Sequence, residues 1–262
     1  QYNNENKVEI KEMNFYIDKL IKGLKNPIKA IFYIIGKGYQ KNKVESALIN
    51  NSPVNLVVHV GGHLAQEVEF YRSLGVEHII WIEADPSIIV KLKSNIEKYE
   101  TAAIRKMEHS VINATISSSD GEEVMFNVFN NKGGSSSIKK PTALMKEKWP
   151  NLSVIGDPLK QITSRLDTIL ASIDLSTYKR KNNLLVIDIQ GNEGPALQGI
   201  GAYGDGLFNM IQTEISKKAL YEESTMFDEV DDWMSEHGYK LASHSYAYVP
   251  WHGDVVYSKI EK

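Results

Sequence analysis

The segment Val54 to Ala65, with the sequence VNLVVHVGGHLA, decides the fold. Its first part, Val54 to Val60, is mostly apolar and β-branched and predicts a buried strand. The adjacent glycines Gly61 and Gly62 indicate a tight turn, after which a helix is expected over Ala65 to Leu74. A strand that passes through a glycine turn into a helix is the first half of a βαβ unit.

The same alternation of strands and helices continues toward the C-terminus. Further strands are expected at His78 to Glu83, His109 to Ile116, Asn183 to Ile189, Leu207 to Ile215, Tyr239 to His244 and Asp254 to Ile260. Helices are expected at Pro86 to Tyr99, Pro141 to Lys148, Glu193 to Gly199 and before Gly238. This order predicts a doubly wound α/β domain with a mostly parallel, seven-stranded sheet that ends in a terminal antiparallel strand.

One interruption of this plan is expected. Asp120-Gly121 is a turn signal, and Glu123 to Phe129 alternates like the hairpin partner of the preceding strand. The segment Lys132 to Ser137 (KGGSSS) then reads as a flexible loop.

The first 50 residues form a separate N-terminal helical extension, and residues 51–262 form the α/β domain. Apolar residues recur at helical spacing between Ile10 and Leu24, Asn26-Pro27 breaks the pattern, and Ile28 to Tyr39 can form a second helix. Capping of the main domain is the favoured role for these helices. Contact with a partner or a membrane surface stays open, as does a homo-oligomer formed through them.

Composition excludes several classes of protein. The chain is 42% hydrophobic and 24% charged with a net charge of −3, as in an ordinary globular protein with no inferred basic surface for nucleic acid. It has no cysteine, which excludes disulfides, thiolate zinc sites and cysteine nucleophiles. Its N-terminal region has neither the ~20 apolar residues of a transmembrane helix nor the plan of a signal peptide, so a cytoplasmic protein is expected.

Informative polar residues follow the predicted strands. In an open α/β sheet a ligand binds at the carboxyl ends of the strands, and glycines there let it approach the backbone. Glu83 ends the second strand, where a carboxylate can accept both hydroxyls of a ribose. The glycines are adjacent and do not form the G-x-G-x-x-G pattern, which weakens a dinucleotide interpretation.

Five segments carry a resemblance to a known family. They are Val57 to Ala65, Trp81 to Pro86, Ser164 to Leu170, Leu185 to Glu193 and Gln212 to Ile215. In this order they resemble the FkbM family of O-methyltransferases, which use S-adenosylmethionine (SAM), and the match covers about residues 54–260. The I-D-I-Q-G-x-E element is the most distinctive. The chain departs from the family's D-V-G-A-N-x-G turn, because His59 replaces aspartate, His63 replaces asparagine and Ala65 replaces the last glycine.

The resemblance implies a class I, Rossmann-like methyltransferase with SAM at the ends of the strands. The methionine moiety would lie along Gly61, Gly62 and His63, the ribose on Glu83 beside Ala84, and the adenine between Asn113 and Ala114. Asp188 would meet the methionine amino group or the incoming acceptor.

A sugar hydroxyl is a poor nucleophile, so a general base or a metal should help to remove its proton. The candidates are Asp188, Glu193, Glu214, His244 and His252. Asp188 and Glu214 end strands that are adjacent in the expected topology and bring two carboxylates to one pocket. With a histidine nearby, such a pair can hold a divalent cation or act as an acid–base pair, and both options stay open.

The acceptor is expected to lie against Ser136, Ser137, Glu193 and Trp251. The two serines belong to a loop that resembles a serine-containing segment of the family, and an aromatic ring suits a sugar face. The favoured hypothesis is therefore a SAM-dependent O-methyltransferase acting on a sugar of a surface polysaccharide, glycolipid or glycosylated natural product. A nicotinamide-dependent oxidoreductase on a similar sheet and a non-catalytic nucleoside-binding module are the alternatives.

Overall fold

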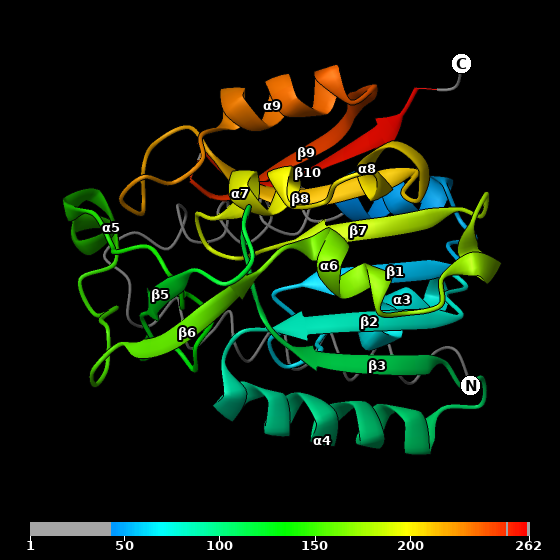
Figure 1. Ribbon diagram of the computed structural model, residues 1–262, viewed down its shortest axis with the longest axis horizontal. Coiled ribbons are helices and arrows are strands. Elements are labelled where there is room, and N and C mark those ends of the chain that lie inside the picture. The colour runs from blue at the N-terminus through cyan, green and yellow to red at the C-terminus, as the bar shows by residue number, and fades with distance from the viewer. Residues whose placement is uncertain (1–42, 250, 261–262) are drawn as a thin grey trace, which may run out of the picture.

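The computed structural model describes residues 43–249 and 251–260, and its fold is a three-layer α/β sandwich. The predicted helices before residue 42 lie outside these ranges. Residues 43–50 are helical. Figure 1 shows the central sheet, with α9 on one side of it and α4 on the other. No described helix is long and apolar enough to cross a membrane.

The central sheet has seven strands in the order β3-β2-β1-β7-β8-β10-β9. They are β1 (Leu56–Val60), β2 (His78–Glu83), β3 (Glu108–Asn113), β7 (Asn183–Ile187), β8 (Met210–Ser216), β9 (Tyr239–Val249) and β10 (His252–Lys259). The pairs β1–β2, β1–β7, β2–β3 and β7–β8 are parallel, whereas β10 is antiparallel to both of its neighbours. The predicted doubly wound, mostly parallel sheet with an antiparallel terminal strand is confirmed.

Helices cover both faces of this sheet. They are α3 (Val68–Ser73), α4 (Pro86–Ala102), α5 (Ala143–Lys148), α6 (Leu166–Ala171), α7 (Glu193–Gln198), α8 (Tyr203–Gly206) and α9 (Phe227–Glu236), with a 3₁₀ turn at Ser176–Tyr178. Strands β1 and β7 are buried along their whole length, because helices pack on both of their faces. One core lies under α6, α7 and α9, and the other lies under α3, α4 and residues 43–50.

The segment after β3 departs from the expected hairpin. The predicted third strand is broken at Ala114, so that β4 (Thr115–Ile116) leaves the central sheet and pairs with β6 (Leu159–Ser164). Strand β5 (Glu123–Phe126) also pairs with β6 and not with the preceding strand. Strand β6 has no equivalent among the predicted strands, because only Thr163 of its residues is fully buried and the sequence LKQITS lacks a clear apolar face.

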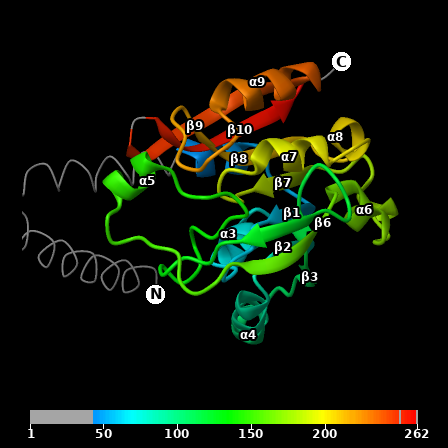
Figure 2. The same ribbon diagram turned by 60° about the vertical axis from the view of Figure 1, so that its left-hand side comes forward.

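Strands β4, β5 and β6 form an accessory sheet, which lies next to the edge where the parallel strands end. Figures 1 and 2 show β5, β6 and α5 beyond the carboxyl ends of β1 and β2. The terminal strands are also longer than predicted, since β9 extends to Val249 and β10 begins at His252.

Replacement of Gly61 by alanine tests the turn that follows β1. Gly61 has a φ of 92°, and an added Cβ atom would lie 1.9 Å from the carbonyl oxygen of Asp188. We expect Gly61→Ala to lower the free energy of unfolding by more than ~3 kcal/mol, through backbone strain and forced separation of β1 from β7. Gly121→Ala is the matched control, because Gly121 has a φ of 79° with no atom within 4 Å, and should cost only ~1 kcal/mol. Equal losses in urea unfolding would contradict this account.

Candidate functional site

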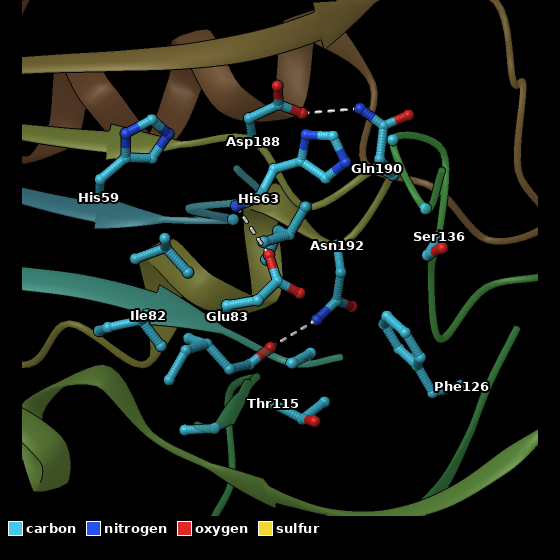
Figure 3. A pocket seen from close by; sticks show the side chains of 18 of the residues that line it. His59, His63, Ile82, Glu83, Thr115, Phe126, Ser136, Asp188, Gln190 and Asn192 are labelled. Carbon is cyan, nitrogen blue, oxygen red and sulfur yellow. Dashed lines mark hydrogen bonds between the residues drawn. The ribbon is translucent and has the colours of Figure 1, made fainter. Parts of the chain in front are cut away.

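A cavity of about 340 Å³ lies where β1, β2 and β7 end. Ligand sites are typically pockets of this size, and the carboxyl ends of parallel strands are their usual place. We call it the cofactor cavity, after the cofactor that the family resemblance leads us to expect there. Figure 3 shows His59, Ile82 and Glu83 on one side of this cavity and Ser136 and Phe126 on the other. Its wall also contains Gly61, His63, Gln66, Glu67, Ala84, Ala114, Thr115, Asp188, Gln190 and Asn192.

The glycine turn forms one wall of the cofactor cavity. The backbone N–H groups of Gly61 and Gly62 both donate to the carbonyl oxygen of Ile82, at 2.8 and 3.0 Å. His63 and Ala65 follow with φ values of 41° and 56°, in the left-handed region that favours glycine and asparagine. The asparagine and glycine of the resembled motif would adopt this conformation easily. His63 and Ala65 adopt it at a cost of ~1–3 kcal/mol for each residue.

Glu83 lies at the end of β2 beside this turn. Its carboxylate accepts the backbone N–H of His63 at 2.9 Å and that of Asp85 at 2.8 Å. Burial raises the pKa of Glu83, and these two N–H groups oppose that rise in part. A carboxylate oxygen has two lone pairs, so Glu83 can still accept hydroxyl groups from a ligand.

The far end of the cofactor cavity is formed by the chain between β3 and β4. The Asn113 amide donates to the carbonyl oxygens of Glu83 and Ala84, at 2.8 and 3.0 Å, and so fastens this segment to β2. Ala114 and Thr115 line the cavity. Asn113 thus holds the wall in place, while the small side chain of Ala114 leaves room for a flat ring.

A turn after β7 brings two carboxylates together. The Gln190 amide nitrogen lies 2.6 Å from Asp188 Oδ1 and 2.9 Å from Glu214 Oε2. Glu214 Oε1 in turn lies 3.2 Å from His252 Nε2. The structure therefore brings together Asp188 from the end of β7, Glu214 from β8 and His252 from β10. The strand-end argument predicted that the two carboxylates would meet.

The carboxylates at this turn repel one another. Burial, together with the charges of Glu214 and Asp254, raises the pKa of Asp188 well above its ordinary value. Burial alone would lower the pKa of His252, but the carboxylates of Glu214, Asp254 and Glu193 together outweigh that effect, and the net shift is upward. An acid with a raised pKa and a histidine beside a carboxylate are groups suited to proton transfer.

Glu193 belongs to the same cluster but is occupied by the backbone. It is buried at the start of α7, where its carboxylate accepts the N–H groups of Ile189 and Gly191. Asp188, Glu193 and Glu214 each offer an oxygen within 4.8 Å of the others, which is close enough for a shared cation. The Gln190 amide and these backbone N–H groups already donate to the three carboxylates, and a divalent metal at this cluster stays a prediction.

A second cavity, of about 790 Å³, adjoins the first. It shares Gly134, Asp188 and Gln190 with the cofactor cavity, so these residues separate the two spaces. The rest of its wall includes polar, aromatic and charged residues, which are Asn130, Asn131, Ser135, Asn151, Trp149, Tyr221, Lys148, Glu214 and His252, and the apolar Met145, Pro150, Leu152 and Leu220. We call this space the acceptor cavity.

A model of the methyltransferase FkbM domain matches residues 59–241, which is more than half of the chain. The match includes the glycine turn, Glu83, Asp188 and Glu214. The chain belongs to the FkbM methyltransferase family. It is a SAM-dependent methyltransferase, and the family resemblance drawn from the sequence is confirmed.

Solved structures are similar at low sequence identity. The methyltransferase FkbM from Methylobacillus flagellatus KT is 15% identical with a TM-score of 0.47, and the match covers 79% of this chain but only 44% of that one. The magnesium protoporphyrin IX methyltransferase from Synechocystis, solved with bound SAM, is 7% identical with a TM-score of 0.46, covering 94% and 91%. Comparison with curated protein sequences found no match.

Three residues expected at the site of this methyltransferase lie elsewhere or serve the framework. His244 is exposed on β9 and pairs with Val255, one position from Asp254, so it faces away from the carboxylates. Trp251 packs against a small apolar cluster that contains Phe129 and Met145. Ser137 is 1% exposed, and its hydroxyl donates to the carbonyl oxygen of Gln190 at 2.7 Å. Ser136, which was expected against the acceptor, lines the cofactor cavity instead.

Several residues that line the cavities were not predicted from the sequence. Gln190 lies inside the distinctive I-D-I-Q-G-x-E element, and its amide was the signal that a bridge between carboxylates is possible. The Trp149-Pro150-Asn151 segment joins an aromatic ring to an amide after a short helix, a combination suited to sugars. Thr115 and Phe126 carry no such signal, because only the pairing of β4, β5 and β6 brings them to the cavity.

Replacement of Glu83 by glutamine tests the cofactor cavity. A hydrogen bond to a charged group contributes about 1.5–3 kcal/mol, so we expect the dissociation constant for S-adenosylhomocysteine to rise roughly 10- to 100-fold in isothermal titration calorimetry. The control is Glu77→Gln, an acid half-exposed just before β2, which should bind with wild-type affinity. Wild-type affinity in Glu83→Gln would show that the carboxylate does not hold the ribose.

The pH dependence of stability tests the buried carboxylate of Glu193. Burial and the charge of Glu214 raise its pKa from 4.5 to about 7. The folded state therefore binds this proton more tightly, so the stabilisation is complete below pH ~4.5 and is lost as the pH rises through ~7. Urea unfolding should show the wild type losing up to ~3 kcal/mol more than Glu193→Gln over this window. Parallel curves would contradict the assignment, and the exposed Glu222→Gln variant should follow the wild type.

Proposed function

We propose that this methyltransferase transfers the methyl group of SAM to a sugar hydroxyl bound in the acceptor cavity. The observation that carries the proposal is the contact between the two cavities at Asp188 and Gln190. A group bound in one cavity can meet a group bound in the other only at this boundary, where the half-buried carboxylate of Asp188 lies with a raised pKa.

The charge of the cofactor cavity supports SAM over a nicotinamide dinucleotide. Among the described residues of its wall, Glu67, Glu83 and Asp188 are acidic and none is lysine or arginine. SAM carries a sulfonium and an ammonium group, whereas a dinucleotide carries a pyrophosphate that favours basic side chains and free N–H groups. The acidic wall complements the cationic cofactor.

The lining of the acceptor cavity supports a sugar. Asn130, Asn131 and Asn151 offer amide donors and acceptors, and Trp149 and Tyr221 offer aromatic surface. Amides satisfy several hydroxyl groups at once, and an aromatic face covers the apolar side of a pyranose ring. The sugar can belong to a surface polysaccharide, a glycolipid or a glycosylated natural product.

Each residue at the boundary then has a role. SAM supplies an electrophilic methyl group on sulfur. Asp188 takes the proton of the acceptor hydroxyl, and its raised pKa lies closer to that of the hydroxyl than an ordinary carboxyl would. Glu214 and His252 form an ion pair in the wall of the acceptor cavity, where they orient the sugar.

A transfer assay with SAM that carries a ¹³C-labelled methyl group tests this function. The enzyme is incubated with a panel of oligosaccharides, glycolipids, peptides and phenols, and the labelled product is located by NMR. We expect label on a sugar oxygen, and loss of ~10²-fold or more in kcat for Asp188→Asn, because general-base catalysis typically contributes that much. Asp157→Asn, an exposed acid outside both cavities, should keep wild-type turnover. Label only on peptides or phenols, or full activity in Asp188→Asn, would refute the proposal.

A further inference from the structure

Gln190 joins two carboxylates that would otherwise repel each other. A primary amide carries two N–H bonds, and the nitrogen of Gln190 lies within hydrogen-bond distance of both Asp188 and Glu214, at 2.6 and 2.9 Å. One N–H group can therefore serve each carboxylate. Figure 3 shows the first of these contacts at the rim of the cofactor cavity.

The orientation of this amide follows from its neighbours. The carbonyl oxygen of the Gln190 side chain lies 2.9 Å from the Tyr221 hydroxyl, which also lies 2.9 Å from the backbone oxygen of Ser135. The reverse orientation would turn the amide oxygen toward two carboxylates and leave their charge uncompensated. Burial raises the pKa of Tyr221 well above its ordinary value, so its hydroxyl keeps the proton that it donates.

The backbone of Gln190 is also held in place. Its φ of 57° lies in the left-handed region, which a residue with a Cβ atom adopts only where the surroundings enforce it. The Ser137 hydroxyl donates to its carbonyl oxygen at 2.7 Å. The next residue, Gly191, has a φ of 99° and packs so closely on Tyr221 and Ser224 that a Cβ would lie 3.1 Å from each. Such strain is typical of positions that serve a site rather than the fold.

We propose that Gln190 is a positioning residue, whose side-chain amide holds the carboxylates of Asp188 and Glu214 side by side where the two cavities meet. Asp188 is thereby held at the boundary where the acceptor would meet the cofactor. The role in methyl transfer rests on the function proposed above, whereas the arrangement of the carboxylates does not.

The proposal predicts how Asp188 titrates. An N–H group that donates to a carboxylate favours the ionised form, so the amide opposes the effect of burial. The other groups that face Asp188 are Glu214 from β8, Asp254 from β10, Glu193 from α7 and Tyr71 from α3, with His252 on the far side of Glu214. None of these donors and charges is removed when only the Gln190 amide is replaced.

Gln190→Met is the decisive variant, because methionine keeps the length of the side chain and lacks N–H donors. The full chain is labelled with ¹³C at the aspartate carboxyl carbons and titrated by NMR, and the resonance of Asp188 is identified by its loss in Asp188→Asn. We expect the midpoint of Asp188 to rise by about one pH unit or more in Gln190→Met. Gln161→Met is the matched control: the Gln161 amide donates to the Ala84 carbonyl oxygen and to no carboxylate, so the midpoint should not move.

An unchanged midpoint in a folded Gln190→Met protein would overturn the proposal. If that variant does not fold, Tyr221→Phe decides by the same measurement, since it removes the hydroxyl that contacts the amide oxygen and the Ser135 carbonyl oxygen but no group that contacts a carboxylate. A smaller upward shift supports the proposal, and no shift overturns it. Neither measurement uses an acceptor, so failure of the sugar assay leaves the result intact. With an acceptor in hand, Gln190→Met should lower kcat and move the acid limb of its pH profile upward, whereas a purely structural role would lower kcat without that shift.

Discussion

The close contact between Gly61 and the carbonyl group of Asp188 is the constraint on which this site depends. No side chain fits between them, because a Cβ on Gly61 would overlap the carbonyl oxygen at 1.9 Å. The N–H of Asp188 also donates to the carbonyl oxygen of Val60 at 2.9 Å. The turn that carries the cofactor and the turn that carries the carboxylates are thus one rigid unit, and a shift of β1 against β7 would disturb both.

The accessory sheet adds specificity to this unit without altering it. Strands β4, β5 and β6 hold the chain that supplies Thr115 and Phe126 to the cofactor cavity. Between β5 and β6 the chain passes along both cavities, contacting His63 through the carbonyl oxygen of Lys132 and Gln190 through Ser137. The α/β frame therefore forms much of the cofactor cavity, while the segment between β5 and β6 forms most of the wall of the acceptor cavity, a division seen widely in enzymes whose loops determine their substrates.

Sequence reasoning succeeded where a single rule of geometry applies. The carboxyl ends of parallel strands meet at one edge, so Gly61, Glu83, Asp188 and Glu214 were predictable from the positions of four strands. It failed for His244, because the side that a residue faces on β9 depends on a register that includes bulges between β9 and β10. It also failed for β6 and for Trp251. Their places depend on contacts with segments far away in the chain, which local patterns do not encode.

His59, one residue before the end of β1, shows how the chain limits the electrostatic cost of its carboxylates. It lines the cofactor cavity together with Asp188, at a position where the resembled motif has an aspartate. Its ring stacks on Trp81 at 5.2 Å, and its Nδ1 atom lies 3.0 Å from the Tyr71 hydroxyl. Burial lowers the pKa of His59, so the ring is neutral near pH 7. A buried aspartate here would add another negative charge beside Asp188, whose pKa is already raised by its neighbours. The neutral ring adds no charge beside Asp188, and the amide of Gln190 opposes the rise of the Asp188 pKa in part.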